Sequence, residues 1–158
     1  FHRGLLQEDL AVSLGKFSID PCKLELEVTE TAIMDDLDLA VQTLNELKKM
    51  GIRTAIDDFG TGHSSLSYLR KLPIEILKID KSFIDEILIS QEDRTLVRGI
   101  IEMVHALGIQ VVAEGVENHQ MATLLQDMHC DLVQGYHYCA PIPADDFLKI
   151  IRNRQCYI

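Results

Sequence analysis

The 158-residue sequence lacks the features that mark several large protein classes. Its longest uncharged stretch, 132–144, contains two prolines and falls short of the ~20 residues that a membrane-spanning helix needs. The four cysteines form no CxxC pair and no zinc-like spacing, which indicates a reduced, cytoplasmic chain. A hydrophobic share of 47% and a charged share of 25% are ordinary for globular proteins and argue against wholesale disorder. We therefore expect one soluble domain, with no membrane contact by this segment.

Basic runs are also missing, and the overall charge is acidic. Lys and Arg together number 15 against 25 Asp and Glu, which gives a formal net charge of -10. Because DNA and RNA are held mainly by Lys and Arg against phosphate, polymeric nucleic acid is not an expected partner. A small phosphate ligand remains compatible with an acidic protein if metal ions or a placed lysine reverse the local field.

Apolar strand-like runs alternate with amphipathic helical patterns along the whole chain. Such alternation is typical of parallel sheets with helical crossovers, so we expect an α/β fold. The expected strands cover 24–28, 54–56, 76–79, 109–113 and 132–133. The expected helices cover 35–50, the stretch from Ser64 to the residue before Pro73, 93–107, 118–128 and a last helix from about Ala144.

Two parallel architectures compete for this pattern, the open doubly wound sheet and the (β/α)8 barrel. Doubly wound nucleotide-binding sheets usually carry a glycine-rich first turn, and neither GxGxxG nor GxxxxGK[ST] occurs here. Five β/α units in 158 residues amount to about five-eighths of a ~250-residue barrel. We therefore predict a TIM-like (β/α)8 barrel, of which this chain carries about the last five β/α units.

Polar side chains occur at each expected strand end, which is where active sites of parallel α/β folds lie. One such residue is ordinary surface chemistry, but unrelated caps have no reason to recur at five consecutive strand ends. Clustered carboxylates favour Mg²⁺ or Mn²⁺, and two such ions can activate water and stabilise both oxygens of a phosphodiester displacement. The candidates are Glu27, Asp57, Asp58, Lys78, Glu114 and Gln134.

Other chemistries have weaker support. The six histidines show no HExxH or paired spacing, and Ser64 and Ser65 lack the GxSxG elbow of serine hydrolases. Strand alternation places Glu25 on the same face as Glu27 and one layer deeper in a barrel, where the sequence alone suggests no partner for it.

Five motifs taken together resemble the EAL domain family of bacterial cyclic di-GMP phosphodiesterases. They are Glu27-Val-Thr-Glu30, Asp57-Asp-Phe-Gly-Thr-Gly62, Leu77-Lys-Ile-Asp80, Ala113-Glu-Gly-Val-Glu117 and Gln134-Gly-Tyr136. The resemblance implies a TIM-like barrel that hydrolyses cyclic di-GMP to linear pGpG with Mg²⁺ or Mn²⁺. It also implies a homodimer formed near the DDFGTG loop.

The resemblance assigns metal-binding and catalytic roles to the matched acidic residues. Glu27 and Asp57 correspond to metal ligands, and Asp58 corresponds to a ligand of the second metal. Glu114 corresponds to the essential carboxylate, which is either the general base or a ligand of the second metal.

Four further residues correspond to positioning groups. Lys78 resembles the residue that holds the catalytic water, and Gln134 resembles the amide that helps to position it. Glu30 resembles the anchor of the loop that runs from residue 58 to residue 64, and Glu117 resembles a supporting carboxylate near the site.

The Glu-Ala-Leu tripeptide and the Asn-x-Ser strand end of the family are absent, although each supplies a metal ligand. Both belong before Phe1, which is not a start Met, so we expect residues 1–158 to be the C-terminal part of a single EAL domain. These residues alone are expected to be nearly inactive. We also expect them either to associate with another chain or to be the ordered part of a longer protein. The alternative function is a catalytically inactive EAL domain that serves as a cyclic di-GMP receptor.

Overall fold

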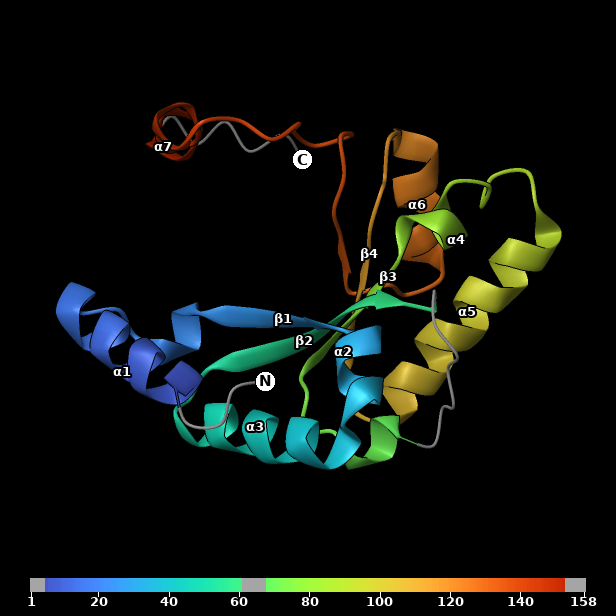
Figure 1. Ribbon diagram of the computed structural model, residues 1–158. Coiled ribbons are helices and arrows are strands. Elements are labelled where there is room, and N and C mark those ends of the chain that lie inside the picture. Colours follow the sequence, from blue (N-terminus) through green and yellow to red (C-terminus); the bar gives the residue numbers. More distant parts are fainter. Residues whose placement is uncertain (1–4, 61–67, 153–158) are drawn as a thin grey trace.

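The sheet has five parallel strands that lie side by side in chain order (Figure 1). The computed structural model describes residues 5–60 and 68–152. In a doubly wound sheet the strand order reverses at one point, whereas sequential order is that of a barrel wall. The strands are β1 (Glu25–Thr29), β2 (Arg53–Phe59), β3 (Ile76–Ile79), β4 (Gln110–Ala113) and β5 (Leu132–Val133).

Helices connect the strands, and most of them cover one side of the sheet (Figure 1). Within residues 5–60 and 68–152, no helix is both long enough and apolar enough to cross a bilayer. The helices are α1 (Leu5–Phe17), η1 (Pro21–Lys23), α2 (Glu30–Asp35), α3 (Leu37–Lys49), η2 (Leu69–Lys71), α4 (Lys81–Ile84), α5 (Gln91–Ala106), α6 (His119–Asp127) and α7 (Ala144–Arg152). The last of these, α7, stands apart at the end of an extended segment and buries none of its residues.

The strands appear where the sequence predicts them, while several helix boundaries differ because of capping side chains. The predicted helix 35–50 begins at Leu37, since the Asp36 carboxylate accepts the Leu39 amide at 3.0 Å. Helix α5 begins two residues early, since the Ser90 hydroxyl accepts the Asp93 amide at 3.1 Å.

Among the described residues, the sequence analysis does not predict the α-helices α1, α2 and α4 or the short helix η1. Helices α2 and α4 are short, and α1 carries a thin apolar stripe in which Leu14 is buried while Val12 and Phe17 are exposed. The helix expected from Ser64 onward falls mainly outside the described residues, and its described part forms η2.

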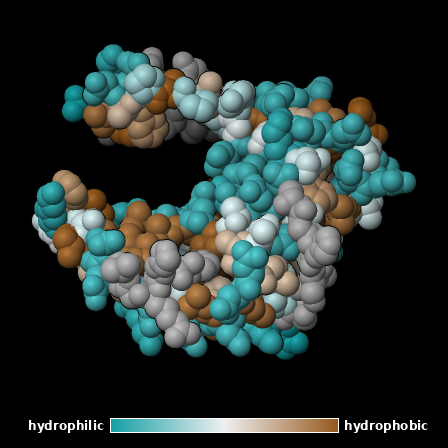
Figure 2. All heavy atoms as spheres, in the orientation of Figure 1, coloured by the Kyte–Doolittle hydropathy of each residue, from teal (hydrophilic) through white to brown (hydrophobic). Residues whose placement is uncertain are grey.

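The two faces of the sheet carry different side chains, because neighbours along a strand point to opposite sides. The helix-covered face buries large aliphatic residues such as Ile56 and Leu77. The other face carries a small separate cluster made of Ala55, Ile76 and Val112. Figure 2 shows the molecule hollowed between α7 and the end that carries α1 and β1. The uncovered face is therefore the side that would face a barrel interior.

The uncovered face also supplies a partner for Glu25. Arg53 lies opposite it in the register of β1 and β2, and its Nη2 atom is 3.7 Å from Glu25 Oε2. The same nitrogen donates to Gln110 Oε1 on β4 at 3.3 Å. The Glu25 carboxylate is thus paired with Arg53, which links β1, β2 and β4.

Asp131 joins α5 to strand β4. Its Oδ2 atom lies 2.7 Å from His105 Nε2 and accepts the backbone amide of Val111 at 2.8 Å. Burial raises the pKa of the Asp131 carboxyl, but the Val111 amide and the His105 ring outweigh burial and hold this pKa below its usual value. The ionised form is therefore the one that the folded state favours.

We expect Asp131→Asn to lower the free energy of unfolding by about 1 kcal/mol at pH 7, a value discounted for partial exposure. A depressed folded-state pKa stabilises the fold above the unfolded pKa, and this contribution is lost as the pH falls through the folded pKa. The difference between the two proteins should therefore shrink as the pH falls below about 4. Urea unfolding between pH 7 and pH 3.5 measures this difference in the free energy of unfolding, with Asp127→Asn, at an exposed position, as the control. A difference that grows toward acid pH would contradict this assignment.

Candidate active site

A buried lysine lies at the centre of the carboxylate cluster that the sequence predicts. Lys78 is 5% exposed on the middle strand β3. Its Nζ atom lies 2.8 Å from Glu27 Oε1, 2.9 Å from Asp57 Oδ1 and 2.7 Å from Glu114 Oε1. One ammonium group therefore holds together carboxylates from β1, from β2 and from the residue that follows β4.

The protonation state of Lys78 follows from two opposing effects. Burial lowers the pKa of this ammonium group. Hydrogen bonds to Glu114, Glu27 and Asp57 outweigh burial, and they hold the pKa of Lys78 above its usual value. Lys78 is consequently a fixed positive charge and hydrogen-bond donor at neutral pH, and it is unsuited to act as a general base.

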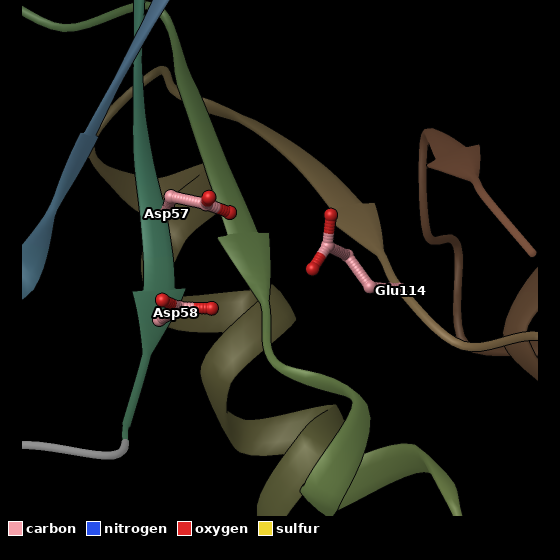
Figure 3. A group of neighbouring side chains, drawn as sticks. All are labelled: Asp57, Asp58 and Glu114. Atoms are coloured by element: carbon pink, nitrogen blue, oxygen red, sulfur yellow. The ribbon is translucent and has the colours of Figure 1, made fainter.

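A bulge in β2 directs two consecutive carboxylates into the site. Neighbouring side chains of a regular strand point to opposite faces, yet Asp57 and Asp58 both point toward Glu114 (Figure 3). The pairing of β2 with β3 shifts register between Ile56 and Phe59, and Asp58 has a φ of 54°. Asp tolerates this left-handed conformation better than most residues, and bulges commonly redirect side chains beside active sites.

Three carboxylates lie close enough to share a cation. Asp57, Asp58 and Glu114 each offer an oxygen atom, and these oxygens lie within 4.8 Å of one another. Burial raises the pKa of the Asp58 carboxyl, and the charges of Asp57 and Asp80 raise it further. A partly buried, all-oxygen set with an excess of negative charge is the donor set that Mg²⁺ and Mn²⁺ prefer. The residues present thus fit a hard divalent cation.

Glu27 reaches the same cluster from its far side. Glu27 contacts Lys78. Among the described residues, it is not one of the three carboxylates, Asp57, Asp58 and Glu114, that lie close enough to share a cation. Its side chain is 45% exposed, compared with 22% for Asp57 and 18% for Glu114. Glu27 therefore lies at the open edge of the site, on the edge strand β1.

Glu30 supports the end of β2. It is 1% exposed as the first residue of α2, and its Oε2 atom accepts the backbone amide of Gly60 at 3.0 Å. Nearby Tyr68 is 3% exposed, and burial together with the Glu30 charge raises the pKa of its hydroxyl. The contact fixes the backbone directly after the Asp pair. The rest of the loop, at 61–67, lies outside the described residues, so the loop anchor and the dimer expected near it stay predictions.

Gln134 lines a pocket next to Glu114. The pocket has a volume of about 270 Å³, and Lys81, Glu117 and Tyr136 also line it. A side chain at Gly135 would place its Cβ atom 2.1 Å from the backbone oxygen of Val116. Glycine at this position therefore lets the Gln134 segment approach the segment that follows β4.

Glu117 is paired, and the partner is a residue that the sequence analysis missed. Lys81 Nζ lies 2.6 Å from Glu117 Oε1 and 2.6 Å from Asp85 Oδ1. These two hydrogen bonds raise the pKa of the exposed Lys81 ammonium group. The only local signal is position, because Lys81 lies three residues after Lys78, at the start of α4.

Comparison with known proteins agrees with this geometry. A family model described as the EAL domain matches residues 1–141. The chain belongs to the EAL domain family. The predicted family and the TIM-like α/β class are thereby confirmed, and the five strands form part of an EAL-type barrel.

Two curated relatives show how much of a larger protein this EAL chain represents. It is 44% identical over 153 residues to "Cyclic di-GMP phosphodiesterase NbdA" of Pseudomonas aeruginosa, covering 95% of this chain and 20% of NbdA. It is 48% identical over 139 residues to "Signaling protein YkoW" of Bacillus subtilis, covering 88% of this chain and 17% of YkoW. The chain spans about a fifth of the length of these relatives.

Solved EAL structures match the fold closely. The phosphodiesterase PaMucR in its c-di-GMP complex has a TM-score of 0.87 at 39% identity, covering 92% of this chain and 59% of that chain. Klebsiella pneumoniae BlrP1 in a manganese/cy-diGMP complex has a TM-score of 0.82 at 34% identity, covering 89% of this chain and 36% of that chain. At both sequence identities, the similarity is informative about more than the fold.

Proposed function

We propose that residues 1–158 form the C-terminal part of a single EAL domain that hydrolyses cyclic di-GMP to pGpG by two-metal phosphodiester cleavage. The observation that carries the proposal is the set of three carboxylates, Glu27, Asp57 and Glu114, on the buried ammonium group of Lys78, with Asp58 close to two of them. The names of NbdA and PaMucR support the activity and the ligand, and the manganese complex of BlrP1 supports the type of metal.

Asp57, Asp58 and Glu114 would hold the divalent ions, with Glu27 completing the set from the open edge. When bound, two such ions polarise the phosphoryl oxygen and lower the pKa of a bound water. The four carboxylates exceed the Lys78 charge by three negative charges. This surplus favours cations in the site, and the cations in turn permit an anionic phosphodiester to approach.

Lys78 orients the site during the reaction. Its ammonium group keeps its proton, so it donates hydrogen bonds to the carboxylates and presents a fixed positive charge to the attacking water and the phosphoryl group. Glu114 is the carboxylate that we assign as general base or as a ligand of the second metal. Gln134 borders the pocket beside Glu114 and is suited to orient the same water through its amide group.

We expect Glu114→Gln to reduce pGpG formation by about 100-fold, because a positioned general base typically contributes ~10²–10⁴-fold. The measurement is chromatographic detection of pGpG formed by the complete domain from cyclic di-GMP with Mn²⁺. The exposed Glu102→Gln on α5 is the matched control and should retain wild-type turnover. Wild-type-like turnover of Glu114→Gln would overturn its assignment. Binding of cyclic di-GMP by the wild type without any product would favour the receptor alternative.

A further inference from the structure

The four-residue helix α4 contacts the backbone at the ends of two site-bearing strands. Its Phe83 ring lies against Gly60, which follows the Asp57 and Asp58 pair. The Lys81 side chain lies against Gly115, which follows Glu114. Helix α4 itself follows β3, the strand that carries Lys78.

Neither glycine has a side chain, and the space beside each is occupied by a side chain of α4, Phe83 at Gly60 and Lys81 at Gly115. A Cβ atom on Gly60 would lie 2.5 Å from the Phe83 ring, and one on Gly115 would lie 2.3 Å from Cγ of Lys81. The backbone φ angles are +99° at Gly60 and +73° at Gly115. This conformation is one that glycine adopts readily and other residues rarely do. The two strand ends are therefore shaped to receive α4.

Lys81 adds polar links to this packing. Its stem covers Gly115, while its ammonium group contacts Glu117 on the segment after β4 and Asp85 at the end of α4. The carboxylates of Asp57, Asp58 and Glu114 must lie within a few ångströms of one another to share cations. A displacement of ~1 Å in a reacting group can lower the rate by about 100-fold.

We propose that α4 is the spacer that sets the distance between the Asp57–Asp58 pair and Glu114, with Lys81 and Phe83 as positioning residues. Phe83 acts through Gly60, and Lys81 acts through Gly115 and Glu117. The proposal rests on the proposed function of the site, since it names the element that keeps the metal-binding carboxylates in register. Neither residue needs to touch the substrate for this role.

A substitution series at Lys81 separates its stem from its charge. Lys81→Ala removes both, Lys81→Met retains the stem, and Lys81→Arg retains both. We expect Lys81→Ala to lower kcat and Mn²⁺ affinity about tenfold, in line with the ~10–100-fold effect of groups that orient metal ligands. KM for cyclic di-GMP should change less than about twofold. Lys81→Arg should restore kcat to within about threefold, and Lys81→Met should lie between the two.

Lys149 supplies the matched control, since its exposed ion pair with Asp146 has the same 2.6 Å length on α7. Lys149→Ala should leave kcat and Mn²⁺ affinity unchanged. Phe83→Leu tests the other contact and should also lower Mn²⁺ affinity. All variants are assayed well below their thermal unfolding midpoints, so that loss of folded protein does not enter the result.

Wild-type kcat and Mn²⁺ affinity in Lys81→Ala would overturn the proposal. An increase in KM at unchanged kcat would also overturn it, because it would show direct substrate binding by Lys81. Failure of the proposed function is a distinct result, in which the wild-type complete domain forms no pGpG. In that case the Mn²⁺ titrations of the same variants still decide whether α4 positions the carboxylates.

Discussion

Replacement of Lys78 by Met is expected to lower cyclic di-GMP hydrolysis by the complete domain about 1000-fold. Methionine nearly fills the space of the lysine stem but carries neither the charge nor the three hydrogen bonds to Glu27, Asp57 and Glu114. Removing one preorganised donor from a developing charge costs 10²–10³-fold in related chemistry. Lys78 also aligns three carboxylates, so its loss should reach or exceed the upper end of that range.

Metal binding distinguishes this explanation from general damage to the fold. Without Lys78 the carboxylates repel one another, and in residues 5–60 and 68–152 no other basic side chain is buried near them. We therefore expect thermal stability of Lys78→Met to rise more steeply with added Mn²⁺ than that of the wild type. The measurements are turnover at saturating Mn²⁺ and thermal unfolding across a Mn²⁺ series, with the exposed Lys49→Met as control. Turnover within tenfold of the wild type would show that Lys78 is dispensable.

Sequence patterns were sufficient for the strand order and for the convergence of the candidate site residues at one rim of the sheet. The site is predictable because the carboxyl ends of parallel strands meet at one rim, so residues as distant as Glu27 and Glu114 converge. Local spacing does not encode the Asp58 bulge, whose effect is to turn two consecutive carboxylates to one side. The turning of both carboxylates to one side depends on how β2 pairs with β3, and this pairing joins segments that are distant in the sequence.

Long-range partners account for most of what the sequence analysis missed. The partner of Glu25 is Arg53, which lies opposite it only after β1 and β2 pair in register. The partner of Glu117 is Lys81, which is 36 residues away along the chain. Neither pair has a periodic signal, because each depends on where two separate elements come together.

The uncovered sheet face leads to the second prediction with a large effect. In the described residues β1 and β5 are the two edges of the sheet, and Glu27 lies on the edge strand with 45% of its side chain exposed. A closed barrel has no such edges. The PaMucR chain extends well beyond the 59% that this chain covers. We therefore propose that further strands close the barrel over Glu27 and supply additional oxygen ligands.

Residues 1–158 by themselves should then turn over cyclic di-GMP at least ~1000-fold more slowly than the complete domain at saturating Mn²⁺. Changes that merely reorient metal ligands already cost ~10–100-fold, so an incomplete ligand set should cost more. Water entering through the open edge would weaken the electrostatic stabilisation that the site provides, and the strand ends would be held less firmly.

Weak Mn²⁺ binding should survive in the isolated chain, because Asp57, Asp58 and Glu114 remain together on one rim. The two proteins are compared by product formation and by Mn²⁺ titration under the same conditions, with Glu114→Gln in each background to establish that the measured turnover comes from this site. Turnover numbers within about tenfold, or ~1.4 kcal/mol of activation barrier, would mean that the five strands hold a sufficient ligand set. The metal would then be bound by the described carboxylates alone, and Glu27 would need no covering strand to act.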